Sequence, residues 1–157
     1  MPKANMPKAN QYIKDGVLHI VYKDKEDISE EIISFANAYE GYIAGRIGFN
    51  LPVDAMIKHD PRHPFVKQCI KDQVKYVIVY KKNDVLTMNH ELCHAKYGMD
   101  ENYRKDVARL WDSLSEKYKK NVKEMLRRMK YPEKDDIILD EFQAYYFTEK
   151  GLFGKFI

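Results

Sequence analysis

Residues 75–80 read Lys-Tyr-Val-Ile-Val-Tyr and form the clearest strand signal in the chain. β-Branched and aromatic residues favour extended backbone, and a continuous apolar run of this length is typical of a buried strand. A second run, at residues 17–22, follows an Asp15-Gly16 pair that favours a turn. The chain is therefore expected to contain a small sheet.

Helical periodicity dominates the rest of the chain. From residue 101 to residue 130, apolar side chains recur every three or four positions, which predicts one long amphipathic helix or two consecutive helices. Similar patterns predict helices near residues 28–43, 65–71, 85–97 and 138–149. We therefore expect an α+β fold, in which a small mixed or antiparallel sheet packs on a helix-rich body.

Length and composition are those of a globular protein with one domain. The chain has 157 residues, of which 45% are hydrophobic and 32% are charged, and a chain of this size can bury one core. The pentapeptide Met-Pro-Lys-Ala-Asn occurs at residues 1–5 and again at residues 6–10. We expect a flexible tail over residues 1–12 and a single domain over residues 13–157.

The bulk properties also limit the partners and the compartment. A net charge of +3 is too small to indicate nucleic-acid binding. No stretch approaches the ~20 apolar residues of a membrane span, and the N-terminus lacks the apolar region of a signal peptide. Two cysteines, Cys69 and Cys93, do not make a disulfide framework. We expect a cytoplasmic protein without a membrane or nucleic-acid partner.

The sequence His90-Glu91-Leu92-Cys93-His94 lies inside the helix predicted over residues 85–97. Each helical residue turns by about 100°, so the two imidazoles stand about 40° apart, one turn from each other. Two neutral imidazoles at this spacing can bind one Zn²⁺ ion. Glu91 flanks the metal position without binding the metal, where it can take a proton from a metal-bound water. The motif indicates a zinc-dependent hydrolase with Glu91 as the general base.

A third metal ligand must come from elsewhere in the chain. A catalytic zinc usually has three protein ligands, and no histidine follows His94 in the sequence. We predict Glu141, a charged residue near the start of an otherwise apolar helix. Asp100, six residues after His94, is the alternative, although it is also well placed to cap a helix that begins at Glu101.

This combination of an HExxH helix and a later glutamate resembles the zincin metallopeptidases, and within them the gluzincins. Residues 141–147, Glu-Phe-Gln-Ala-Tyr-Tyr-Phe, are also similar to the ligand helix of the anthrax-lethal-factor-like peptidases. The resemblance implies a zincin-like metallopeptidase domain that hydrolyses a peptide or protein substrate. It implies His90, His94 and Glu141 as zinc ligands and Glu91 as the general base. It leaves the oligomeric state open.

The resemblance also implies supporting roles. A tyrosine hydroxyl often stabilises the oxyanion in such sites, and Tyr145, one turn after Glu141, is the first candidate, followed by Tyr131 and Tyr97. Zincins commonly bind peptide along a sheet edge by strand addition. Residues 76–80 are therefore either that edge or simply a central strand.

Two alternatives to an active peptidase stay open. One is a non-catalytic module of the same fold that binds protein or nucleic acid. The other is a latent protease whose apolar C-terminal segment, residues 152–157, occupies its own cleft. The intact Glu91 favours an enzyme, because a binding module does not need a general base.

Overall fold

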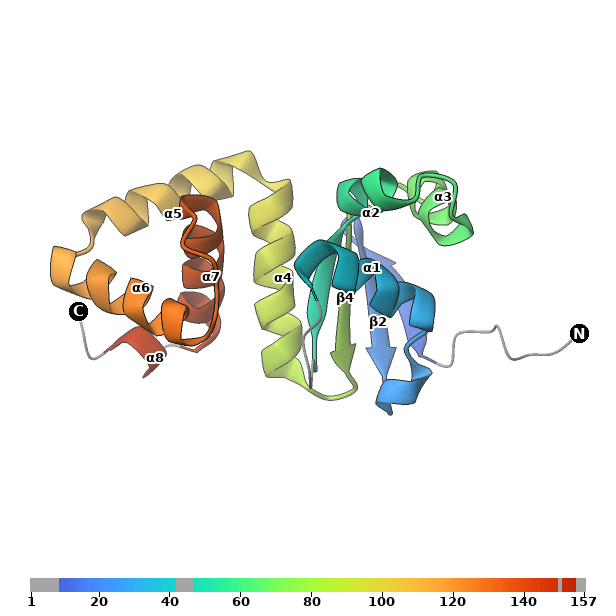
Figure 1. Cartoon of the computed structure of the whole chain (residues 1–157), viewed down its shortest axis with the longest axis horizontal. Helices are drawn as coiled ribbons and strands as arrows, with labels where there is room; N and C mark the ends of the chain where they lie inside the picture. The colour runs from blue at the N-terminus through green and yellow to red at the C-terminus, as the bar shows by residue number, and fades with distance from the viewer. Residues whose placement is uncertain (1–8, 42–46, 150, 155–157) are drawn as a thin grey trace, which may run out of the picture. The chain divides into compact units, whose positions relative to one another are not determined.

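A computed structural model describes residues 9–41, 47–149 and 151–154 of the chain. Its elements fall into two units, Met1–Glu91 and Leu92–Ile157, and the boundary lies inside helix α4 (Val85–Met99). The first unit holds a four-stranded sheet, and the second is built from helices (Figure 1). The α+β prediction is confirmed, while the single domain over residues 13–157 stays a prediction.

The sheet of the first unit is mixed, as predicted. Its strands are β1 (Asn10–Lys14), β2 (Val17–Tyr22), β3 (Phe49–Pro52) and β4 (Tyr76–Lys81), in the order β1-β2-β4-β3. β1 and β2 form an antiparallel hairpin whose turn residues, Asp15 and Gly16, have φ angles of 53° and 78°. A tight hairpin turn of type I′ requires positive φ at both positions. β4 runs parallel to β2 and antiparallel to β3.

β4 lies at the centre of the sheet, between β2 and β3. The interpretation of residues 76–80 as a sheet edge is therefore wrong, and the alternative of a central strand is correct. Ile78 pairs with His19 on one side and with Asn50 on the other, and it is fully buried. The edge strands β1 and β3 were not predicted. β1 begins at Asn10, inside the predicted tail, whose residues 1–8 lie outside the described part of the chain.

Helices cover one face of this sheet. They are α1 (Glu30–Glu40), α2 (Val53–His59) and α3 (Pro64–Lys71), and a short 3₁₀ helix, η2 (Lys25–Asp27), precedes them without a buried residue. α1 begins where the Ser29 hydroxyl accepts a hydrogen bond from the Ile32 amide at 3.3 Å, a typical N-cap. The buried core joins the sheet residues Leu18, Ile20, Phe49, Leu51, Val77 and Val79 to Phe35 of α1, Met56 of α2 and Val66 of α3.

The first turns of α4 lie against β3. Side chains alternate between the two faces of a strand, so Asn50 points away from the core that its neighbours on β3 enter. Its Nδ2 donates a hydrogen bond to Oε1 of Glu91 at 3.3 Å. A Cβ atom built on Gly48 would lie only 2.3 Å from Cγ2 of Thr87. This close approach of strand and helix therefore requires glycine at residue 48.

The second unit contains the rest of α4 together with α5 (Glu101–Ser113), α6 (Glu116–Arg128), α7 (Asp135–Thr148) and α8 (Gly151–Gly154). The periodicity over residues 101–130 belongs to two helices, because the Ser115 hydroxyl caps α6 by accepting from the Tyr118 amide at 3.1 Å. Phe142 of α7 is fully buried at the centre of this unit. Its ring contacts those of Trp111, Tyr118 and Phe153.

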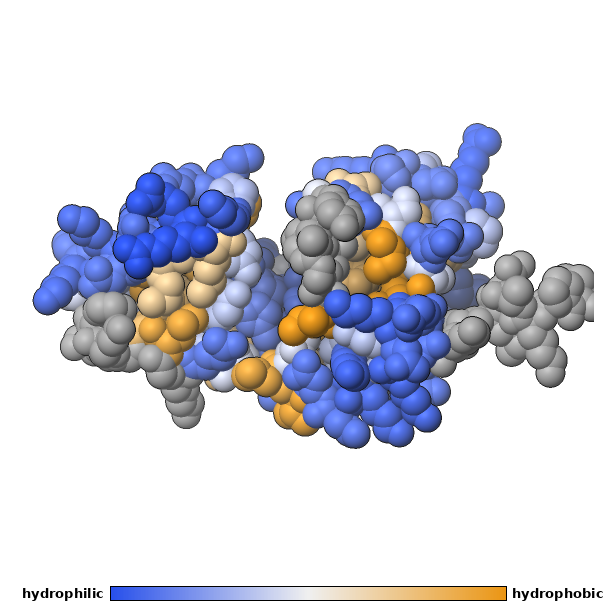
Figure 2. Space-filling model, turned by 60° about the horizontal axis from the view of Figure 1, so that its bottom comes forward, coloured by the Kyte–Doolittle hydropathy of each residue, from blue (hydrophilic) through white to orange (hydrophobic). Residues whose placement is uncertain are grey.

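On the face drawn in Figure 2, most exposed residues are hydrophilic and apolar ones gather in small areas. Exposed apolar residues include Val85 and Leu86 at the start of α4. Within the described residues, no helix combines the length and the apolar character that crossing a membrane requires.

Candidate metal centre

The HExxH motif lies in the middle of α4, as predicted. Asp84 caps the helix: its Oδ1 accepts from the Thr87 amide at 3.1 Å and its Oδ2 from the Thr87 hydroxyl at 2.6 Å. The helix continues to Met99 and passes through Gly98, where the sequence predicted a stop near Tyr97. His90, Glu91 and His94 are therefore fixed by regular helical geometry.

These three side chains converge. One ligand atom from each of His90, Glu91 and His94 lies within 4.8 Å of the other two. Glu91 and His94 are 5% and 3% exposed, and His90 is half-buried. The predicted grouping of two imidazoles and a carboxylate on one helix is confirmed, and the group can hold a metal ion.

Two acids of α7 contact the two ring nitrogens of His94. Nδ1 lies 2.8 Å from Oδ1 of Asp140, and Nε2 lies 3.3 Å from Oε2 of Glu141. Burial of the ring lowers the pKa of His94, but the hydrogen bonds and charges of Asp140 and Glu141 outweigh this effect and hold the pKa well above its usual range. The imidazole therefore lies in a strongly anionic environment.

The two candidates for the third ligand differ in their positions. Glu141 lies beside His94, within the second unit. Asp100 instead caps α5, where its Oδ1 accepts from the Tyr103 amide at 3.0 Å. The sequence predicted this capping role as the other use of Asp100.

The three tyrosine candidates for oxyanion stabilisation have different surroundings. The hydroxyls of Tyr131 and Tyr145 are 2.9 Å apart. Burial, the Glu141 charge and the hydrogen bond to Tyr145 raise the pKa of Tyr131 strongly, while burial raises that of Tyr145. Both hydroxyls therefore keep their protons at neutral pH. Tyr97 packs against the apolar core of the second unit, and burial also raises its pKa.

Sequence reasoning missed two partners of the motif residues, Asn50 and Asp140. Asn50 contacts Glu91 and is 8% exposed, but a single asparagine in a four-residue strand with a proline gives almost no sequence signal. Asp140 precedes the predicted ligand Glu141, and their adjacency is a usable signal. Two consecutive acids in an apolar helix are expensive to bury unless each has a partner.

Leu152 and Phe153 of the C-terminal segment pack in the core of the second unit. Phe153 is 1% exposed, and its ring contacts those of Tyr118, Phe142 and Tyr145. Phe153 therefore belongs to the core of the second unit, and an autoinhibitory role of residues 152–157 stays a prediction. Residues 155–157 lie outside the described part of the chain.

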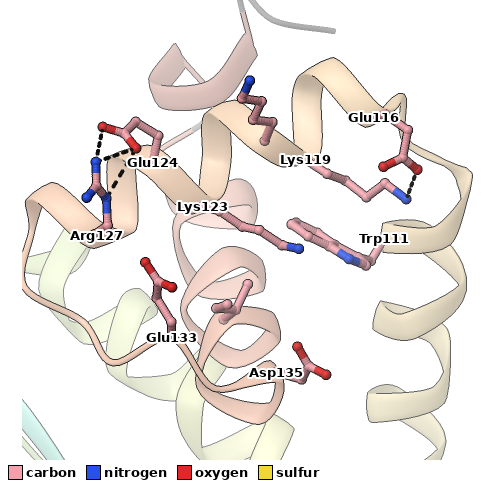
Figure 3. A pocket seen from close by; sticks show the side chains of 10 residues that line it. Trp111, Glu116, Lys119, Lys123, Glu124, Arg127, Glu133 and Asp135 are labelled. Carbon is pink, nitrogen blue, oxygen red and sulfur yellow. Dashed lines mark hydrogen bonds and ion pairs between the residues drawn. The ribbon is translucent and has the colours of Figure 1, made fainter.

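A groove of about 470 Å³ lies elsewhere on the second unit, along α5, α6 and the start of α7 (Figure 3). Lys119 lies 2.8 Å from Glu116 in its wall, and Arg127 lies 2.8 Å from Glu124. The lining charges balance, with four bases, Lys119, Lys120, Lys123 and Arg127, and four acids, Glu116, Glu124, Glu133 and Asp135. This balance does not select a charged ligand, and no predicted site residue lines the groove.

Comparisons with known proteins gave no match to any family model, curated protein or solved structure. Two findings therefore stand on the chain's own geometry: α4 carries a His-Glu-His group with HExxH spacing, and the fold around it is α+β.

Proposed function

We propose that the chain is a zinc-dependent metallopeptidase in which His90, His94 and Glu141 bind the metal. The observation that carries the proposal is the 3.3 Å distance between His94 Nε2 and Glu141 Oε2. It puts a carboxylate from a distant helix beside one of the two motif imidazoles. Two imidazoles and a carboxylate are a donor set of catalytic zinc sites, which keep one position open for water or substrate.

The surroundings of His94 fit a metal ligand. Asp140 accepts a hydrogen bond from Nδ1 at 2.8 Å, which orients the ring and leaves Nε2 as the atom available to a metal. Largely buried acids beside a buried imidazole carry a large desolvation cost unless their charge is matched. A divalent cation would match it.

Zinc bound by these residues would supply a Lewis acid for the scissile carbonyl and a water of lowered pKa. Glu91 takes the proton of the attacking water and passes it to the leaving amine nitrogen. Asn50 donates a hydrogen bond to Oε1 of Glu91 and so helps to orient that carboxylate. The orientation of the Glu91 carboxylate matters for catalysis, because proton transfer requires the carboxylate oxygen to lie within hydrogen-bond distance of the attacking water.

Tyr145 is our proposed donor to the oxyanion that forms when water attacks the peptide carbonyl. It is one turn after Glu141, and its hydroxyl is hydrogen-bonded to that of Tyr131. The raised pKa values of both tyrosines keep both hydroxyls protonated, and an oxyanion needs a protonated donor.

Replacement of Glu91 by glutamine tests the proposal. The zinc-loaded wild type and the Glu91→Gln variant are incubated with a mixed peptide library, and cleavage is followed by mass spectrometry. We expect the variant to lose about 100-fold or more in rate, because a general base contributes that much, and to keep its zinc. Glu101→Gln is the matched control, since this glutamate is exposed on α5 and pairs only loosely with Lys105 at 3.8 Å.

Equal cleavage by wild type and Glu91→Gln would refute the role given to Glu91. Zinc binding by a wild type that hydrolyses no peptide would instead identify the non-catalytic binding module.

A further inference from the structure

Gln143 of α7 is fully buried and connects three helices of the second unit. Its Oε1 accepts a hydrogen bond from the Tyr103 hydroxyl at 2.7 Å. Its Nε2 lies 3.1 Å from the Cys93 carbonyl oxygen and 3.1 Å from Oδ1 of Asp140. A buried amide is costly unless its groups are hydrogen-bonded, and here the amide oxygen and nitrogen both have partners.

The partners define the orientation of this amide. The Cys93 carbonyl can only accept a hydrogen bond, so the NH₂ group of Gln143 must face it. The second N–H of the same group then points to Asp140, and the amide oxygen is left for the Tyr103 hydroxyl. The opposite orientation would place two acceptors against each other at Cys93.

The same network orients His94. Oδ1 of Asp140 accepts from Gln143 at 3.1 Å and lies 2.8 Å from Nδ1 of His94. The ionised carboxylate can only accept a hydrogen bond, so it favours a proton on Nδ1 of the imidazole. Gln143 holds the carboxylate in the position where it does so. Nε2, which faces Glu141, is then the nitrogen that would give up its proton and bind a metal.

We infer that Gln143 is a positioning residue for the metal centre, which acts through Asp140 and is itself held by Tyr103. The inference rests on the zinc site of the proposed function but does not depend on peptide hydrolysis. Gln143 orders the Asp140 carboxylate, and the carboxylate sets the tautomer and orientation of His94. Partners of this kind typically change metal affinity by about 10–100-fold.

Two variants and one control test the inference. Gln143→Met removes every hydrogen bond of the amide at similar side-chain volume, and Tyr103→Phe removes only the hydroxyl that holds the amide oxygen. Tyr118→Phe is the matched control, because it deletes a buried tyrosine hydroxyl of the same unit that has no hydrogen-bond partner within the described structure. Zinc affinity is measured by competition with a chromophoric chelator. The ring nitrogens of His94 are followed by nitrogen-15 NMR, with His90 as an internal reference.

We expect zinc affinity to fall about tenfold or more in Gln143→Met, and to fall less in Tyr103→Phe. In both variants the His94 Nδ1–H should exchange faster with water, while the signals of His90 and of the Tyr118→Phe protein stay unchanged. Should Gln143→Met not fold, Tyr103→Phe alone decides. Wild-type affinity and an unchanged His94 spectrum in folded variants would overturn the inference, whereas a wild type that binds no zinc through His94 would overturn the proposed function instead.

Discussion

Replacement of Gly48 by alanine should destabilise the protein through one contact. The added carbon would lie 2.3 Å from Cγ2 of Thr87 and 3.2 Å from the Val79 carbonyl oxygen. Non-bonded carbon atoms pack at about 3.5–4.0 Å, so the first contact overlaps by more than 1 Å relative to that spacing. Thr87 has little freedom to rotate away, because its hydroxyl is hydrogen-bonded to Asp84 at 2.6 Å.

The magnitude follows from two opposing effects. Overpacking of this kind costs about 1–3 kcal/mol, and the loss of glycine flexibility in the unfolded chain returns about 0.4–1 kcal/mol. We expect the free energy of unfolding to fall by about 1–2 kcal/mol in Gly48→Ala. In a Thr87→Ser background, which keeps the hydroxyl but removes Cγ2, the overpacking is relieved and the same substitution should stabilise the protein by up to about 0.4–1 kcal/mol.

The four proteins of this double-mutant cycle are compared by urea denaturation, followed by circular dichroism. The predicted coupling between the two positions equals the overpacking that Thr87→Ser removes, about 1–3 kcal/mol. Gly41→Ala is the control: its φ of 82° makes alanine unfavourable through backbone strain, and no described atom lies within 4 Å of the added carbon. Its effect should be the same in both backgrounds. If Gly48→Ala is equally destabilising with threonine or serine at residue 87, the packing of β3 against α4 described above is incorrect.

Two further predictions concern one buried residue in each unit. Phe142 is fully buried, and its ring centroid lies 4.9 Å from that of Trp111. Phe142→Ala should reduce the free energy of unfolding, measured by urea denaturation, by about 3–5 kcal/mol. A loss below about 1 kcal/mol would contradict the described core. Burial and, to a smaller extent, the Lys14 charge lower the pKa of His19 below its ordinary 6.5. Below pH 6.5 the unfolded chain therefore binds more protons than the folded protein. The free energy of unfolding should fall as the pH drops from 6.5 to the folded-state pKa and then level off. Thermal unfolding of His19→Gln should lack this part of the pH dependence, and an identical pH profile would refute the assignment.

The sequence predicts those elements whose signal is local. β4 is a continuous apolar run up to Tyr80, and β2 is apolar apart from His19, because both faces of each strand are buried. β1 is exposed along its whole length, and its only apolar residues, Tyr12 and Ile13, are adjacent and give no alternating pattern. β3 has only four residues and ends in a proline. Its place in the sheet comes from pairing with β4, which no local pattern encodes.

The same distinction holds for the site. His90, Glu91 and His94 lie on one helix, so the helical period alone predicts that they converge. The contacts of His94 with α7 depend on how the helices of the second unit pack, and the sequence offered only residue type and the resemblance to gluzincins as guides to Glu141. The network through Gln143 required the structure, because a glutamine in an apolar helix has no distinctive pattern.

X-ray absorption at the zinc edge of the zinc-loaded chain tests the central claim most directly. We predict nitrogen and oxygen ligands at about 2.0–2.2 Å, with the outer scattering of two imidazoles and no sulfur. A sulfur ligand at about 2.3 Å, or the scattering of fewer than two imidazoles, would contradict a centre built from His90, His94 and a carboxylate.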